Sequence, residues 1–184
     1  KNRFMKGANR LCTTLYHHIR NIKYSGTESA FARHAIFMAD NYSENKNNTV
    51  LLFCNELVRR GWYDSIELIF GPVGHTHDGS DAVHYIHNRI AGNYTSPTLG
   101  HFVEHWPSCF RKDGTMPSPV LMDVQYDWDA RYKEYSQKIT HFTNPKHADN
   151  SVGAFRVQRS PKGGHVEVMW KARANDNRWL GENG

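Results

Sequence analysis

Two short apolar runs separated by a helical pattern are the most constraining feature of this 184-residue sequence. The runs span residues 35–39 and 66–70, and a polar cluster follows each one where a strand would stop. Between them apolar residues recur at helical spacing, and Gly61 follows as a candidate helix C-cap. Strands joined by a helix of this length form a parallel pair with a right-handed crossover. We therefore expect both polar clusters at the carboxyl edge of the sheet, where open α/β sheets bind their ligands.

Further helices and strands are predicted before and after this strand–helix–strand unit. Further helical segments are expected over residues 8–21, 79–90 and 98–110 and from about Trp128 to Tyr135. Alternation with period two predicts a β-hairpin from residues 154–158 and 165–170, and residues 120–126 are a candidate edge strand. The expected fold class is α/β, with residues 1–110 as the core and residues 111–184 as an extension that packs on it.

Composition sets broad limits on function. The hydrophobic content of 39% is enough to fill a core, and the formal charge of +5 is compatible with a polyanionic partner, although the basic residues form no continuous tract. Cys12 and Cys54 fall at apolar helical positions, which favours buried thiols in a reducing, intracellular compartment over disulfides. No apolar run approaches the roughly 20 residues that a membrane span requires, so no membrane partner is expected.

Two aspartates are candidate catalytic metal ligands. Asp40 ends the first run, and Asp81 opens the helix expected after the second. Their carboxylates could converge on Mg²⁺ or Mn²⁺, since hard cations prefer oxygen ligands, and Asp78 is a third candidate ligand. The alternative is structural: Asp78 fits a helix N-cap, Asp81 fits the third position of that helix, and Asp40 fits a strand-end turn.

His75 and His77 alternate in the second polar cluster and indicate a transition-metal or phosphate site. The Gly-His-Thr-His segment resembles the last metal-binding motif of calcineurin-like metallophosphoesterases. The other motifs of that family, an early Asp-x-His and a Gly-Asn-His, are missing from this chain. The alternative is that both histidines shape the strand-to-helix turn through hydrogen bonds.

The first polar cluster is rich in asparagine and contains one lysine. Asn41, Asn45 and Lys46 are candidate nucleic-acid contacts, because amide and ammonium groups bind phosphate oxygens. Asparagine also builds turns and helix caps, which explains the same composition without a ligand.

Several motifs together resemble a family of transposon-derived proteins with ribonuclease H-like domains of the DDE-type transposase or integrase kind. They are Met38-Ala39-Asp40-Asn41, Glu44-Asn45-Lys46-Asn47, Gly61-Trp62-Tyr63, Val73-Gly74-His75-Thr76-His77-Asp78 and Asp81. The resemblance runs from about Gly7 to Trp179.

The resemblance implies a ribonuclease H-like mixed sheet flanked by helices. In it, Asp40 would close the fourth strand, Asp81 would open the helix after the fifth, and a third carboxylate on the first strand would complete a magnesium site. Only Lys1 to Lys6 precede the first helix here, so another segment or chain is expected to complete the sheet. The implied function is nucleic-acid binding with magnesium-dependent phosphodiester chemistry, retained or vestigial. The alternative is a domesticated, non-catalytic structural or assembly subunit.

Overall fold

The computed structural model of this chain describes residues 7–24, 32–39, 45–71, 124–139 and 152–181. The described elements are α1 (Ala8–Tyr24), β1 (His34–Ala39), α2 (Asn48–Arg59), β2 (Ser65–Phe70), α5 (Trp128–Ser136), β3 (Ala154–Arg159) and β4 (Val166–Lys171). They belong to one of the two units into which the chain divides, the one that comprises residues 1–74 and 124–184. The described part contains no helix long and apolar enough to cross a membrane.

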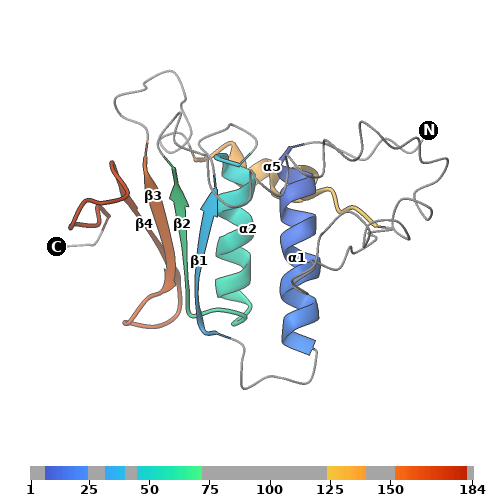
Figure 1. Cartoon of the computed structure of the whole chain (residues 1–184), viewed down its shortest axis with the longest axis horizontal. Helices are drawn as coiled ribbons and strands as arrows, with labels where there is room; N and C mark the ends of the chain where they lie inside the picture. The colour runs from blue at the N-terminus through green and yellow to red at the C-terminus, as the bar shows by residue number, and fades with distance from the viewer. Residues whose placement is uncertain (1–6, 25–31, 40–44, 72–123, 140–151, 182–184) are drawn as a thin grey trace, which may run out of the picture. The chain divides into compact units, whose positions relative to one another are not determined.

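The four strands form one mixed sheet in the order β1-β2-β3-β4 (Figure 1). β1 and β2 are parallel, which confirms the arrangement predicted from the two apolar runs. β3 pairs antiparallel with β2 and also with β4. The predicted C-terminal hairpin is therefore present, and it extends the same sheet from the far side of β2.

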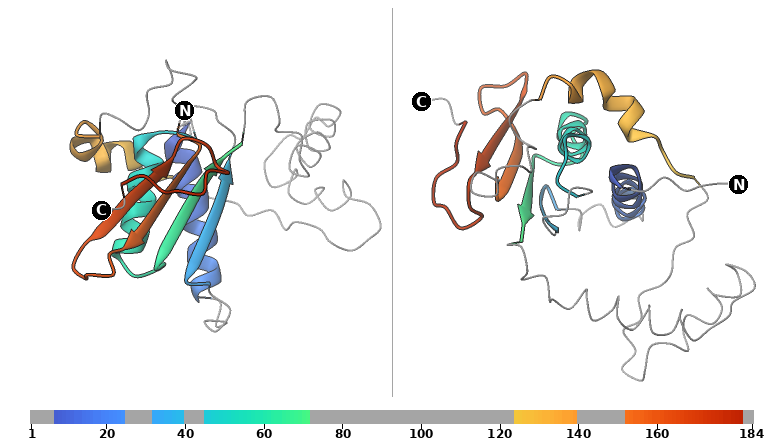
Figure 2. Two further views of the ribbon diagram at one scale, coloured as in Figure 1. Left: turned by 90° about the vertical axis from the view of Figure 1, so that its left-hand side faces the viewer. Right: turned by 90° about the horizontal axis from the view of Figure 1, so that it is seen from above.

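The described helices all lie on one face of this sheet (Figure 2). α2 packs directly on the strands, and it also contacts α1 and α5, which contact each other. The covered face of the sheet carries Phe37, Leu68, Phe155 and Trp170 side by side in register. On the opposite face of β1, Ile36 and Met38 are 64% and 79% exposed.

The ends of α2 follow from local chemistry. Asn47 is the N-cap, and its side-chain oxygen accepts a hydrogen bond of 3.0 Å from the backbone N–H of Val50. After the last turn, Gly61 has a φ of 74°, a left-handed conformation that glycine adopts without the steric cost of a Cβ. A Cβ there would also come within 2.9 Å of the Arg159 guanidinium. Gly61 therefore ends the helix as predicted.

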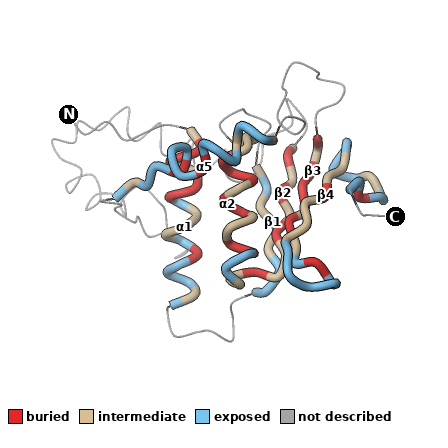
Figure 3. Tube along the Cα trace, turned by 180° about the vertical axis from the view of Figure 1, so that it is seen from behind, coloured by how far each residue is buried: buried red, intermediate tan, exposed pale blue. Residues whose placement is uncertain are grey.

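The helices are joined by hydrogen bonds as well as by apolar packing. Thr13 on α1 accepts hydrogen bonds from the indole N–H of Trp128, at 3.1 Å, and from the backbone N–H of Tyr126, at 3.2 Å. The described residues 124–126 thus form no strand, contrary to the expected edge strand, because Tyr126 is tied to a helix. Burial is highest along the middle of α2 and on β2 and β3 (Figure 3).

Some of the remaining sequence expectations are confirmed, and the others concern residues that the structure does not describe. The helices near residues 8–21 and 128–135 are present as α1 and α5. Cys12 and Cys54 are free and buried, and burial raises the pKa of both thiols, as expected of inert structural cysteines. The helices expected over residues 79–90 and 98–110, and the boundary near residue 110, lie outside the described residues.

Substitution of Phe53 tests the packing of α2 against α5. Its side chain is 1% exposed, and its ring lies 4.9 Å from that of Trp128 in an edge-to-face arrangement. Phe53→Ala is expected to lower the free energy of unfolding by about 3–5 kcal/mol, since it leaves a cavity between α2 and α5. Met38→Ala, at an exposed site, is the control and should cost less than about 0.5 kcal/mol. Equal losses for the two variants in urea unfolding would contradict the packing described.

Candidate nucleic-acid interface

The carboxyl ends of β1 and β2 lie side by side. The last residues of the two strands, Ala39 and Phe70, are register partners, and the backbone N–H of Gly71 donates to the Ala39 carbonyl at 3.0 Å. Asp40 is the next residue after Ala39, so the chain leaves both strands at one edge. This confirms the prediction that the two strands end at the same edge of the sheet.

Lys46 lies at this carboxyl edge. Its ammonium nitrogen is 5.2 Å from the centre of the Phe70 ring, within the range of a cation–π contact. Burial lowers the pKa of Lys46, because a partly desolvated ammonium is less stable than a hydrated one. Lys46 is thus a half-buried cation beside the end of β2, just before α2 begins.

The asparagines of the first polar cluster divide between capping and tethering roles. Asn47 caps α2, which is the structural alternative that the sequence left open. The side-chain amide of Asn48 donates to the carbonyls of Ser136 and Ile139 at 2.9 and 3.0 Å, and so ties α2 to the end of α5. Asn45 is partly buried in the turn before α2.

The other predicted site residues lie outside the described residues. They are Asp40, Asn41, His75, His77, Asp78 and Asp81. In the part of the chain that the structure describes, no three histidine, cysteine or acidic side chains are grouped to hold a metal ion. The structure therefore brings together the ends of the two strands and Lys46, and leaves the convergence of the carboxylates a prediction.

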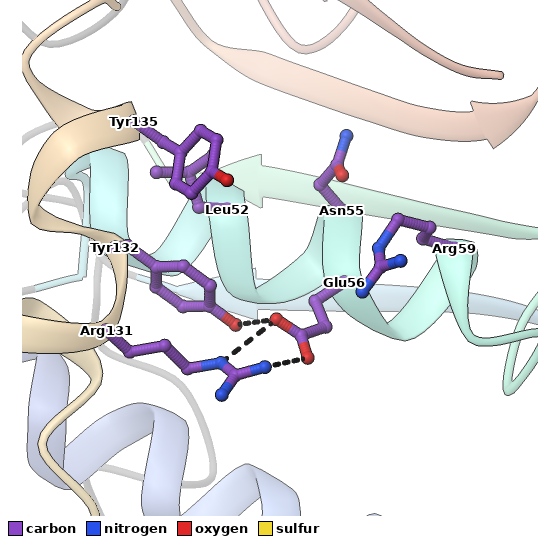
Figure 4. A pocket seen from close by; sticks show the side chains of 7 residues that line it. All are labelled: Leu52, Asn55, Glu56, Arg59, Arg131, Tyr132 and Tyr135. Atoms are coloured by element: carbon purple, nitrogen blue, oxygen red, sulfur yellow. Dashed lines mark hydrogen bonds and ion pairs between the residues drawn. The ribbon is translucent and has the colours of Figure 1, made fainter.

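A second cluster of polar residues lies between α2 and α5, and the sequence interpretation missed it. These helices enclose a pocket of about 480 Å³ (Figure 4). It is lined by Leu52, Asn55, Glu56, Arg59, Arg131, Tyr132 and Tyr135. The helical spacing of the polar residues on each helix was a usable signal, but their meeting depends on contacts between residues about 75 positions apart.

Glu56 is the electrostatic centre of this pocket. Arg131 donates to both of its carboxylate oxygens, at 3.2 and 2.6 Å, and the Tyr132 hydroxyl donates to one of them at 2.9 Å. Arg60, one helical turn along α2, lies 2.5 Å from the same carboxylate. Burial opposes the charge on Glu56, but these hydrogen bonds and the two arginine charges together hold its pKa below the usual value.

Comparison with known proteins identifies a family but no function. A family model described as "Domain of unknown function (DUF7869)" matches residues 1–176. The chain therefore belongs to this family. No curated protein and no solved structure matches the chain.

The Glu56 cluster makes stability depend on pH. Because the pKa of Glu56 is lower in the folded state, its contribution is present above the unfolded pKa of about 4.3 and is lost as pH falls through the folded pKa. Glu56→Gln is expected to lower the free energy of unfolding by about 1–2 kcal/mol at neutral pH. The difference from wild type should shrink when urea unfolding is repeated below pH 4, roughly the unfolded pKa.

Glu134→Gln is the matched control, since Glu134 is exposed on α5. It should change stability by less than about 0.5 kcal/mol. A Glu56→Gln penalty that stays constant across the acid range would show that the charge of Glu56 is not what the cluster stabilises.

Proposed function

We propose that this chain is a transposase-derived, ribonuclease H-like domain that binds nucleic acid at the carboxyl edge of β1 and β2. The observation that supports it most is the register of the parallel pair. It brings the ends of both strands to one edge, with the Lys46 ammonium beside them. Sheets with parallel strands bind ligands at this edge, and a partly desolvated lysine attracts a phosphate oxygen more strongly than a fully hydrated one does.

The described sheet is compatible with the ribonuclease H-like proposal but carries one additional feature. The sheet is mixed, and the family resemblance would make β1 and β2 the fourth and fifth strands of that fold. β1 is an end strand among the described strands, and its outer edge is the one at which the first strand of that fold would pair. β3 and β4 occupy the other side of β2 and extend the sheet beyond the fifth strand.

Metal-dependent chemistry is the finer part of this proposal. Mg²⁺ or Mn²⁺ would be held by Asp40 and Asp81, with Asp78 as a further ligand, because carboxylate oxygens are the ligands these ions prefer. A bound ion would stabilise the charge on the attacking and leaving oxygens of a phosphodiester. Lys46 supplies a cation at the described part of the edge. This cation can contact a phosphate whether or not catalysis is retained.

Lys46→Ala tests the proposal directly. Anisotropy of a fluorescently labelled DNA duplex should show binding that weakens steeply with salt, because phosphate contacts release counterions. The variant should weaken binding about equally for unrelated sequences and reduce the slope of log K against log salt by about 1.

Lys162→Ala is the matched control. Lys162 lies in the turn between β3 and β4, at the opposite edge of the sheet, and it is exposed. Its loss should leave the salt slope nearly unchanged. If the wild-type chain fails to bind duplex or single strands at low salt, the proposal is wrong. The assembly-subunit alternative, favoured by exposed Ile36 and Met38 on the end strand, would then take its place.

A further inference from the structure

The pocket between α2 and α5 is open to one side and has the volume of a small-molecule site. Its volume of about 480 Å³ lies within the range of roughly 300–1,000 Å³ that is typical of ligand pockets. Asn55 and Arg59 enter from α2, and Tyr135 enters from α5 (Figure 4). Leu52 adds an apolar surface between them. The lining therefore combines hydrogen-bonding groups, positive charge and an aromatic ring.

The pocket carries an excess of positive charge. Glu56 is the one acidic side chain among the described residues that line it, and its carboxylate is already bonded to Arg131 and paired with Arg60. Arg59 also lines the pocket, is exposed, and has no acidic partner within hydrogen-bonding distance among the described residues. An anionic group entering the pocket would thus meet a guanidinium that is not paired with a carboxylate of the described residues. Arginine is well suited to such contacts, because its planar fork binds phosphate through two donors.

The aromatic wall is equally accessible. Tyr135 is 59% exposed, and the Lys138 ammonium lies 5.9 Å from its ring centre. Tyr132, by contrast, is buried and its hydroxyl is bonded to Glu56. Proteins that bind single strands combine such exposed rings, on which bases stack, with cations that contact the phosphates. Tyr135 is available for this stacking, and Tyr132 serves to hold Glu56.

We propose that this pocket binds a nucleoside phosphate, either free or as one unit of a single strand. Arg59 contacts the phosphate, Tyr135 stacks on the base, and Asn55 offers a donor and an acceptor to the base edge. Glu56 holds Arg131 in place and limits the positive charge of the pocket. This inference goes beyond the carboxyl-edge function and does not depend on it, since Lys46 does not line the pocket.

The test compares thymidine 5′-monophosphate, a short oligothymidylate and inorganic phosphate as probes in calorimetric titrations of the full chain. The monophosphate or the oligonucleotide should bind, and Tyr135→Ala should weaken that binding by about 5- to 160-fold, the value of one stacked base. Arg59→Ala should weaken it by about tenfold or more, as expected for a charged hydrogen bond. Binding of the oligonucleotide alone would assign the pocket to strands, and binding of both would assign it to nucleotides in general.

The controls are Arg20→Ala and Tyr24→Ala, which remove an exposed arginine and an exposed tyrosine from α1. Both should leave the affinity unchanged within about twofold, a change of less than 0.5 kcal/mol. Glu56→Gln should raise the affinity for the monophosphate, because it removes a negative charge from the pocket. Circular dichroism of each variant confirms that it is folded.

Three results would overturn the inference. One is the absence of binding by both nucleotide probes. Another is binding that neither Arg59→Ala nor Tyr135→Ala reduces. The third is inorganic phosphate binding as tightly as the monophosphate, which would leave no role for the base. Failure of this proposal can be distinguished from failure of the carboxyl-edge proposal. Lys46→Ala tests duplex binding at the edge, whereas Arg59→Ala tests mononucleotide binding in the pocket.

Discussion

The rest of the described structure depends on the burial of α2 on two sides. This helix lies between the sheet and the helices α1 and α5, and its apolar residues are not confined to one narrow stripe. Val50, Phe53, Cys54 and Val58 are each 2% exposed or less. A helix enclosed in this way fixes the distance between the sheet and the outer helices, because interiors are close-packed and tolerate little change in volume. The position of α2 also determines where nearby polar residues lie. Lys46 and Asn47 lie just before the helix, and Asn55, Glu56 and Arg59 lie on its side that faces the pocket.

The local part of this arrangement could be predicted from the sequence. Residues 35–39 and 66–70 are short apolar runs joined by a helical pattern, and chain geometry leaves few ways to connect them other than a parallel pair. The period-two alternation of the C-terminal segment predicted the hairpin, and Gly61 marked the end of α2. These features are encoded within about ten residues each, which is why pattern alone was sufficient.

The pocket could not be predicted in the same way. In the sequence, Glu56 and Arg131 resemble ordinary solvated residues on two helices. They are 75 positions apart in the chain, and they pair only when α5 packs on α2. That packing depends on Trp128, whose ring contacts Phe53 and whose indole N–H is bonded to Thr13 on α1. Residues 124–126, the described part of the expected edge strand, are not a strand for a related reason, since the backbone N–H of Tyr126 donates to Thr13. Non-local contacts of this kind override local propensity.

The central claim is that the edge formed by the ends of β1 and β2 contacts nucleic acid. A titration of the ¹⁵N-labelled chain with a short DNA duplex, followed by amide chemical shifts, tests it most directly. The account predicts that the largest shifts occur at Lys46, Asn47 and Gly71, and that the amides of Lys162 and Gly163 in the opposite turn change little. Saturable shifts confined to the β3–β4 turn or to the outer face of β1, with the amides of Lys46 and Gly71 unchanged, would contradict it.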